Sequence, residues 1–184
     1  NTTTVSQTVT VTDLVAPIVQ TQNITVNLSA QGTASITAMQ VNNGSTDNCG
    51  IASMSVSPSS FTCANLGANT VTLTVVDQNG NTSTATAIVT VVDNLAPVAL
   101  ANNITVVLNS QGTASITAAQ VNNSSTDNCG IASISISKTT FDCSNIGNNT
   151  VVLTVTDTSG NVSSVNANVL VKDEIDMLVK VTAK

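Results

Sequence analysis

Apolar and polar residues alternate along several stretches of the chain with a period of two residues. The alternation is longest over residues 70–75 and 165–172, and shorter versions occur over 24–28 and 52–56. Successive side chains of a β-strand point to opposite faces of a sheet, so this period predicts strands with one buried face.

Turn-forming residues separate these stretches, for example Gln31-Gly32, Ser57-Pro58 and Asn79-Gly80. The predicted strands are therefore short and numerous, which is the pattern of a small sandwich of two packed sheets. The composition agrees, because β-branched Val and Thr are abundant and fit a pleated, half-buried surface. The predicted fold class is all-β.

The strongest feature of the sequence is an internal repeat with an offset of 80 residues. Residues 31–38 recur unchanged at 111–118, and residues 45–53 recur unchanged at 125–133. A match of this length without a gap predicts two copies of one domain in tandem.

The repeat sets the predicted domain boundaries. The first repeat spans residues 14–93 and the second spans residues 94–173, while residues 1–13 align with 81–93 and are expected to be the last strand of a preceding repeat. Residues 174–184 break the pattern and stay unassigned. The linker is short and contains Pro97, whose backbone φ is restricted, so the repeats are expected to stack as an extended rod.

Charge and residue types exclude several classes of function. The formal net charge is −6, with ten acidic residues against four lysines, so no basic patch is expected to bind nucleic acid. No apolar run approaches the roughly 20 residues of a membrane span, which argues against direct membrane insertion. His and Tyr are absent, and no nucleophile has a neighbouring base, so we expect no enzymatic activity.

Four cysteines occur as two equivalent pairs, Cys49 with Cys63 and Cys129 with Cys143. An even number of cysteines at a repeated spacing predicts disulfides and an oxidising, extracellular compartment. Pairing within each repeat is favoured because the two local pairs are identical, and a loop of about 15 residues closed in this way would stabilise a small core by roughly 3 kcal/mol. Bonds between repeats or between molecules are the alternative.

Seven of the ten acidic residues occupy three fixed positions of the repeat. The first position holds Asp13, Asp93 and Asp173, the second holds Asp47 and Asp127, and the third holds Asp77 and Asp157. In an immunoglobulin-like sandwich these positions are expected to converge at the end that faces the preceding repeat. Asn48, Asn79 and Asn81 are expected to bring amide oxygens there too, and oxygen ligands of this kind suit Ca²⁺.

A second interpretation of the same residues needs no metal. Asp and Asn are common in turns because their side chains accept hydrogen bonds from nearby backbone amides. The sequence leaves both interpretations open, a Ca²⁺ ion at the junction between repeats or turn stabilisation alone.

Several of these motifs together resemble a known family of surface modules. The residues that carry the resemblance are Thr46-Asp-Asn-Cys-Gly-Ile-Ala-Ser, Phe61-Thr-Cys, Gly67 to Asp77, Gly80-Asn81 and Val91 to Pro97. They are similar to hyalin-repeat-type, immunoglobulin-like modules, and more closely to the tandem repeats of large Bacteroidetes surface proteins such as SprB-type gliding-motility adhesins. Hyalin-type repeats often carry a further Cys in the last strand, and this chain has none over 82–92.

The resemblance implies a segment of a secreted adhesin or filament at the cell surface. The short linker with Pro97 predicts that the repeats act as a stalk or spacer with neighbouring repeats as partners. The low charge and the faces rich in Thr, Ser and Asn suit weak contacts with polysaccharide or other surface ligands, in attachment or gliding. Two alternatives stay open: repeats that assemble themselves into an extracellular structural filament, and a spacer module of a secreted hydrolase.

Overall fold

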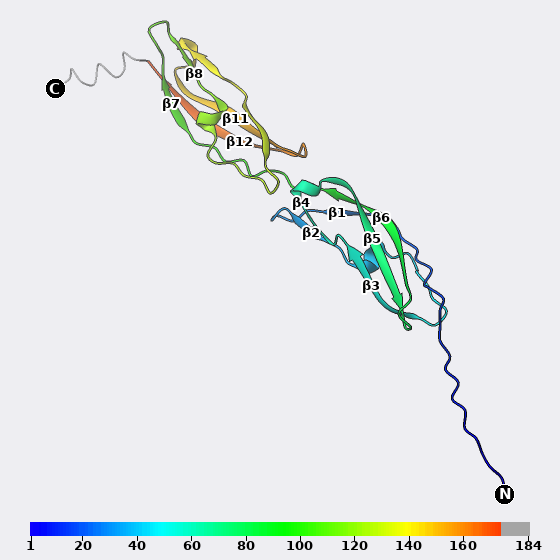
Figure 1. Cartoon of the computed structure of the whole chain (residues 1–184). Helices are drawn as coiled ribbons and strands as arrows, with labels where there is room; N and C mark the ends of the chain where they lie inside the picture. Colours follow the sequence, from blue (N-terminus) through cyan, green and yellow to red (C-terminus); the bar gives the residue numbers. More distant parts are fainter. Residues whose placement is uncertain (174–184) are drawn as a thin grey trace. The chain divides into compact units, whose positions relative to one another are not determined.

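The structure of the chain, a computed structural model, describes residues 1–173. The tail of 174–184, which the sequence left unassigned, lies outside the described residues. The chain divides into two compact units, the first made of residues 1–28 and 33–92 and the second made of residues 29–32 with the chain from Asp93 onward. Both units are visible as separate groups of strands in Figure 1.

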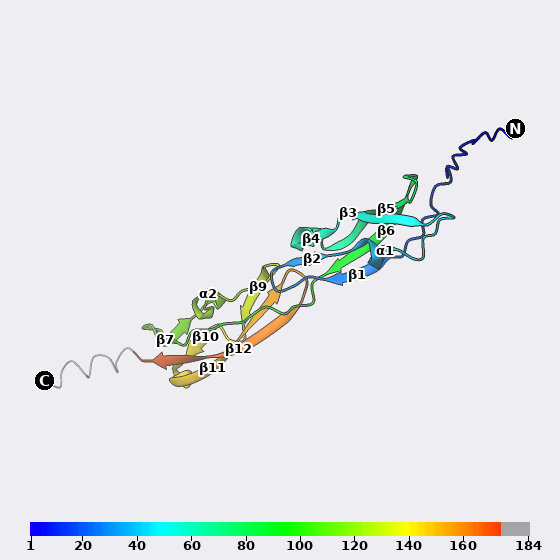
Figure 2. The ribbon, with the colours of Figure 1, turned by 90° about the horizontal axis from the view of Figure 1, so that it is seen from below.

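The first unit contains one larger and one smaller sheet. The larger sheet has the strand order β1-β6-β5-β3 and the smaller sheet pairs β2 with β4. These elements, with two short helical turns, are β1 (Ile24–Asn27), β2 (Thr33–Ser35), α1 (Ala38–Val41), β3 (Ile51–Ser57), β4 (Ser60–Thr62), η1 (Cys63–Asn65), β5 (Gly67–Asp77) and β6 (Thr82–Val92). Figure 2 shows the short strands β2 and β4 beside the long strands of the same unit.

The second unit repeats this arrangement strand for strand, with the order β7-β12-β11-β9 in the larger sheet and β8 paired with β10 in the smaller one. Its elements are β7 (Ile104–Val107), β8 (Thr113–Ser115), α2 (Ala118–Val121), β9 (Ile131–Ile136), β10 (Thr140–Asp142), η2 (Cys143–Asn145), β11 (Gly147–Asp157) and β12 (Val162–Lys172). The identical topology follows from the repeated apolar pattern.

The strand pairing confirms the predicted immunoglobulin-like, all-β sandwich. In each unit three strands of the larger sheet, β3, β5 and β6 in the first, pair antiparallel in the order of the C, F and G strands of that fold. The first strand, β1, runs parallel to β6 at the edge of the sheet. All strands of the first unit lie within residues 14–93, and all strands of the second unit lie within residues 94–173. Residues 29–32, which belong to the first repeat, are grouped with the second unit.

The core of each unit follows the alternation seen in the sequence. Val71, Leu73 and Val75 in β5 are fully buried, and the residues between them are half-buried. The remaining core side chains of the first unit are Leu28, Ile36, Val41, Phe61, Ala87, Val89 and Val91, and the second unit buries the residues 80 positions later. A single Phe and small aliphatic side chains therefore fill each sandwich.

The long hairpin of β5 and β6 defines two ends in the first unit. At one end the turn between the two strands runs from Asp77 to Asn81; we call this the entry end, because residues 13–15 contact Asn81 there. At the other end Gly67 pairs with Val91, close to the last residue of β6; we call this the exit end. The second unit has the same two ends, at the Asp157 turn and at Gly147 respectively.

Residues 1–13 form no strand in the structure and are exposed, apart from the half-buried Asp13. The expectation that they complete a preceding repeat therefore stays a prediction.

Candidate metal centre

Asp47 lies in the loop that leads into β3, where its side chain stabilises a turn. Its Oδ1 atom accepts hydrogen bonds from the backbone N–H groups of Cys49 (2.9 Å) and Gly50 (3.1 Å). The loop folds this way because a short acceptor side chain can satisfy amides two and three residues ahead, and because Gly50 adopts a φ of +99°. Asp127 makes the same pair of bonds to Cys129 and Gly130 in the second unit.

Asp77 ends β5 and opens the hairpin turn. Its Oδ1 atom accepts from the backbone N–H groups of Asn79 and Asn81, both at 2.8 Å, and its Oδ2 atom accepts from the Asn81 side-chain amide at 2.7 Å. Only 2% of Asp77 is exposed. Asp157 repeats these contacts with Ser159 and Asn161.

Asp13 brings the entering chain to the same end of the first unit. Its Oδ1 atom accepts from the backbone N–H of Val15 (3.0 Å), and its backbone carbonyl accepts from the side-chain amide of Asn81 (3.1 Å). The equivalent Asp93 is bound by Leu95 and Asn161 in the second unit. The amide of Asn81 therefore ties the entering chain to the hairpin.

These contacts bring together the three repeated acidic positions in each unit. One oxygen each from Asp13, Asp47 and Asp77 lies within 4.8 Å of the others, and the same is true of Asp93, Asp127 and Asp157. We call these the first and second aspartate clusters. The convergence at the entry end that the sequence predicted is therefore found in both units. Asp173, the third residue of the first repeated position, is in neither cluster.

Each cluster contains a carboxylate oxygen that the turn contacts do not satisfy. The Oδ2 atoms of Asp13, Asp47 and Asp127 are buried and have no hydrogen-bond partner. A buried acceptor without a donor costs roughly 1–3 kcal/mol, and more when it is charged. The partners of the clustered carboxylates, in the part of the chain that the structure describes, are amide, hydroxyl and thiol groups, and none of them is basic.

Hydrogen bonds keep two of the carboxyl groups of the first cluster ionised. The backbone N–H of Val15 is the largest cause of a lowered pKa at Asp13. Burial raises the pKa of Asp77, but the side-chain and backbone donors of Asn81 and Asn79 outweigh it, and the pKa is lowered overall. The pKa of Asp157 is lowered by the same balance. These carboxyl groups are therefore anionic at neutral pH.

One detail of the predicted ligand set is wrong. The side chains of Asn48 and Asn81 present their NH₂ groups, not their oxygens, to Asp13 and Asp77. The reason is that carboxylates only accept hydrogen bonds, so they attract the amide donors. Asn79 contributes its backbone N–H to Asp77.

The donor set of each cluster fits a hard cation. It consists of carboxylate oxygens close together, without His and without a deprotonated thiol, which suits Ca²⁺ better than zinc or copper. The two sequence interpretations prove compatible, because the Oδ1 atoms stabilise turns while the Oδ2 atoms of Asp13, Asp47 and Asp127 are left without donors.

The cysteines differ from the prediction. Cys63 and Cys129 are disulfide-bonded, whereas Cys49 and Cys143 are free and exposed. The expected pairs Cys49–Cys63 and Cys129–Cys143 are therefore wrong, because the members of each pair lie at opposite ends of their sandwich. Instead, the thiol of Cys49 donates a hydrogen bond to Asp13, which raises the pKa of the thiol.

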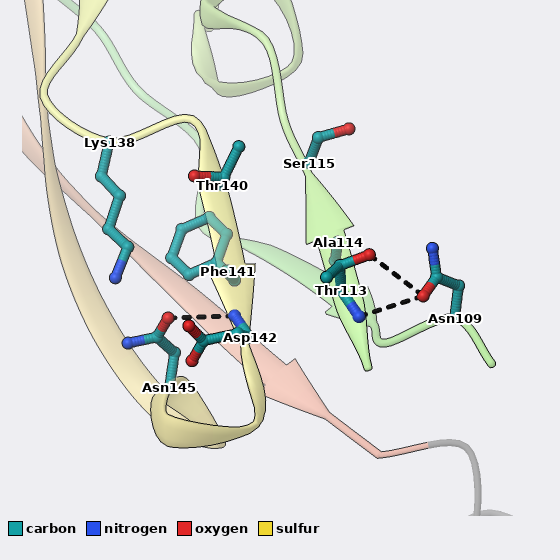
Figure 3. A pocket seen from close by; sticks show the side chains of 9 residues that line it. All are labelled: Asn109, Thr113, Ala114, Ser115, Lys138, Thr140, Phe141, Asp142 and Asn145. Atoms are coloured by element: carbon teal, nitrogen blue, oxygen red, sulfur yellow. Dashed lines mark hydrogen bonds between the residues drawn. The ribbon is translucent and has the colours of Figure 1, made fainter. Parts of the chain in front are cut away.

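A second feature was not predicted, a hollow of about 430 Å³ on the smaller sheet of the second unit. Figure 3 shows Lys138 beside the ring of Phe141, with its ammonium 5.0 Å from the ring centre, and Asp142 and Asn145 on the same side. The signal was present in the sequence, since Lys138 and Asp142 replace Pro58 and Thr62 of the first repeat. Phe141 is itself buried, so its ring offers no exposed face for stacking on a sugar.

No helix among the described residues has the length and apolar character needed to span a bilayer.

Comparison with known proteins identifies no family. No family model matches the chain, and no curated protein matches it. Among solved structures it is similar to the protocadherin GammaB4 extracellular domain, with 16% identity over 88% of this chain and a TM-score of 0.41. It is also similar to Drosophila N-cadherin EC1-4, with 10% identity over 85% of this chain and a TM-score of 0.44. A third similar structure is that of the fibronectin(III)-like modules of Clostridium thermocellum CbhA, with 13% identity over 85% of this chain and a TM-score of 0.30.

The chain spans about a third of the protocadherin GammaB4 chain, about half of the N-cadherin chain and 94% of the CbhA chain. These similarities are too low to assign a function, which has to be argued from the geometry of the chain itself.

Proposed function

We propose that the chain is a non-enzymatic segment of tandem sandwich repeats that serves as a spacer in an extracellular adhesin, and that each repeat binds one Ca²⁺ ion at its entry end. The observation that carries the proposal is the duplicated aspartate cluster. In both repeats three carboxylates converge within 4.8 Å, with buried oxygens that lack hydrogen-bond donors.

A cation explains the clusters better than turn stabilisation does. A turn needs one oxygen of Asp47, and that oxygen is Oδ1. A turn does not require the second oxygen of Asp47 to be buried, and it does not require two further aspartates close by. Like charges at this distance repel one another, and a divalent ion would reverse the sign of that interaction.

The position of the second cluster supports a mechanical role for the ion. Val92 is the last residue of β6, and the next residue, Asp93, belongs to the cluster with Asp127 and Asp157. An ion held there would fix the chain at the point where it leaves the first sandwich. A spacer gains from this, because fewer free backbone torsions remain in the linker that ends at Pro97.

Attachment to surfaces follows from the same architecture as a finer proposal. The exposed positions of the strands are rich in Thr, Ser and Asn, which suit weak polar contacts with polysaccharide that become strong through repetition. Cell-surface display and a role in gliding belong to this finer proposal.

Calorimetric titration of the chain with CaCl₂ tests the metal site. We expect two ions per chain, with dissociation constants of about 10⁻⁴–10⁻³ M, the range of extracellular calcium modules. When free Ca²⁺ is about ten times the dissociation constant, each unit should gain about 1.4 kcal/mol of stability, which raises its melting temperature by several degrees.

Matched variants separate the clusters from general charge effects. Asp47→Asn and Asp127→Asn should each remove one of the two ions, and the double variant should remove both. Asp142→Asn removes an acidic residue outside the clusters and should leave both ions bound. Absence of heat and of any melting shift up to about 5 mM CaCl₂, above that affinity range, would leave the aspartates as turn residues only.

A further inference from the structure

The two cysteines of the first repeat lie at opposite ends of the sandwich. Cys49 is at the entry end, where its backbone N–H binds Asp47 and the next residue, Gly50, accepts a hydrogen bond from Gln78 in the hairpin turn. Cys63 begins η1, which leads directly into the first residues of β5 at the exit end.

The second repeat has the same arrangement. Gly130, next to Cys129, accepts a hydrogen bond from Thr158 at the entry end. Cys143 begins η2 at the exit end, beside the β7–β8 turn, where its Sγ atom lies 3.8 Å from the carbonyl oxygen of Gly112.

The distance between the two ends excludes a disulfide within a repeat. The 11 residues of β5 separate them, and at about 3.3 Å per residue this strand is roughly 36 Å long. A disulfide requires Cα atoms within about 7 Å. Each cysteine can therefore bond only to a cysteine outside its own sandwich.

Both kinds of position support a disulfide. Cys63, an exit-end cysteine, and Cys129, an entry-end cysteine, are disulfide-bonded. The two that are left, Cys49 and Cys143, are again one of each kind, and both are free and exposed. The residue at the same position of the other repeat is therefore disulfide-bonded for each free thiol: Cys129 for Cys49, and Cys63 for Cys143.

We propose that Cys143 of one copy of the chain and Cys49 of a second copy form a disulfide that joins the copies head to tail. Because the two thiols belong to different surfaces, the contact is heterologous, and repeating it extends the copies into a line unless the rotation between them closes a ring. This cross-link is independent of the calcium site in its chemistry, although Cys49 lies close to the first aspartate cluster.

The reaction is a thiol–disulfide exchange. The two thiols lose two protons and two electrons as the S–S bond forms, and a low-molecular-weight disulfide or a disulfide oxidoreductase accepts them and is reduced to two thiols. Such oxidants belong to the extracellular and periplasmic compartments in which disulfides persist.

Oxidation of the purified chain with oxidised glutathione tests the proposal, with non-reducing electrophoresis and peptide mapping as readouts. We expect a ladder of linear multimers, which dithiothreitol should reduce to monomers. Peptides that link Cys49 to Cys143 should make up more than half of all cross-linked peptides, because random coupling of the two thiols would give one half. Random proportions of the three possible links would overturn head-to-tail pairing, and a map containing Cys49–Cys63 or Cys129–Cys143 would overturn the geometric argument.

Serine variants provide the controls. Cys49→Ser and Cys143→Ser should each stop at a dimer or monomer, and the double variant should stay monomeric with an unchanged circular dichroism spectrum. Calcium titration of the double variant separates the two proposals, because it contains every aspartate of both clusters and neither coupling thiol. Multimers longer than dimers from either single variant would contradict the cross-link.

Discussion

At the scale of single residues, the two oxygens of an aspartate in this chain can have different surroundings. Sequence patterns predicted that Asp47 and Asp77 are either turn residues or metal ligands. The Oδ1 atoms of both residues stabilise turns, while the Oδ2 atom of Asp47 is buried without a donor, which is the basis of the proposed metal site. The sequence could not decide, because turn propensity and ligand chemistry select the same residue types. Which carboxylate oxygen lacks a donor depends on contacts between residues far apart in the sequence, such as the bond from the side-chain amide of Asn48 to Oδ1 of Asp13.

Asp142 allows a residue-scale prediction about pH. The hydroxyl and backbone N–H of Ser144 are the largest causes of the lowered pKa of this carboxyl group, and Lys138 adds to them. A carboxyl group whose pKa is lower in the folded than in the unfolded chain stabilises the fold above its unfolded pKa, about 3.9. That contribution is lost as the pH falls through the lower, folded pKa.

We therefore expect the NMR titration midpoint of the Asp142 carboxyl carbon to lie below about 3.9. The melting temperature of Asp142→Asn should show a weaker pH dependence below about pH 4 than that of the parent chain. Thr62→Val, at the equivalent position of the first repeat, is the control, since it removes no titrating group. A midpoint at or above the unfolded value would contradict the hydrogen bonds of Ser144.

At the scale of elements, the alternation of apolar and polar residues was sufficient to predict the long strands. Residues 70–75 lie within β5 and 165–172 within β12. The buried positions of these stretches are all apolar, while Val165 and Leu170 of β12 are half-buried. The short elements were harder to predict, because α1 and η1 span only four and three residues and carry no periodic signal. The path of the chain along β3 and back along β5 separates Cys49 from Cys63 in space, and loop length alone could not show this.

Leu73 in β5 and Leu153 in β11 give an element-scale prediction about stability. Both side chains are fully buried at the centre of their sandwiches. Replacing either with Ala should cost about 2–5 kcal/mol, because the small aliphatic core has few side chains that can fill the cavity. Each variant should lower the urea midpoint of its own unit. Circular dichroism or NMR can measure this midpoint, whereas intrinsic fluorescence cannot, because the chain has no Trp or Tyr.

Thr72→Ala is the matched control for Leu73→Ala. Its side chain is half-buried on the opposite face of the same strand, and the change should cost less than about 1 kcal/mol. Equal losses in the two variants would mean that strand pairing, rather than the buried face, carries the stability of β5.

At the scale of the whole molecule, duplication makes each local feature recur, so small effects are multiplied along the chain. The 80-residue offset predicted two equivalent clusters and two equivalent cores, and both are present in the described residues. The sequence could not predict which cysteines bond, because that depends on the ends of the sandwiches rather than on spacing along the chain.

The two aspartate clusters provide an internal control for the effect of Ca²⁺ on the stiffness of the linker. Asp127→Asn and Asp47→Asn each remove one ligand, but only the cluster of Asp127 contains Asp93, the residue that directly follows β6. If Ca²⁺ fixes the linker, small-angle X-ray scattering of the parent chain should show a narrower range of maximum dimensions in about 5 mM CaCl₂ than in EGTA. This concentration is about 5–50 times the expected dissociation constant. Asp127→Asn should lose this difference and Asp47→Asn should keep it. Identical scattering with and without calcium in the parent chain would mean that Pro97 and packing set the stiffness. Loss of the difference in both variants would show that the effect follows total charge and not the ion at Asp93.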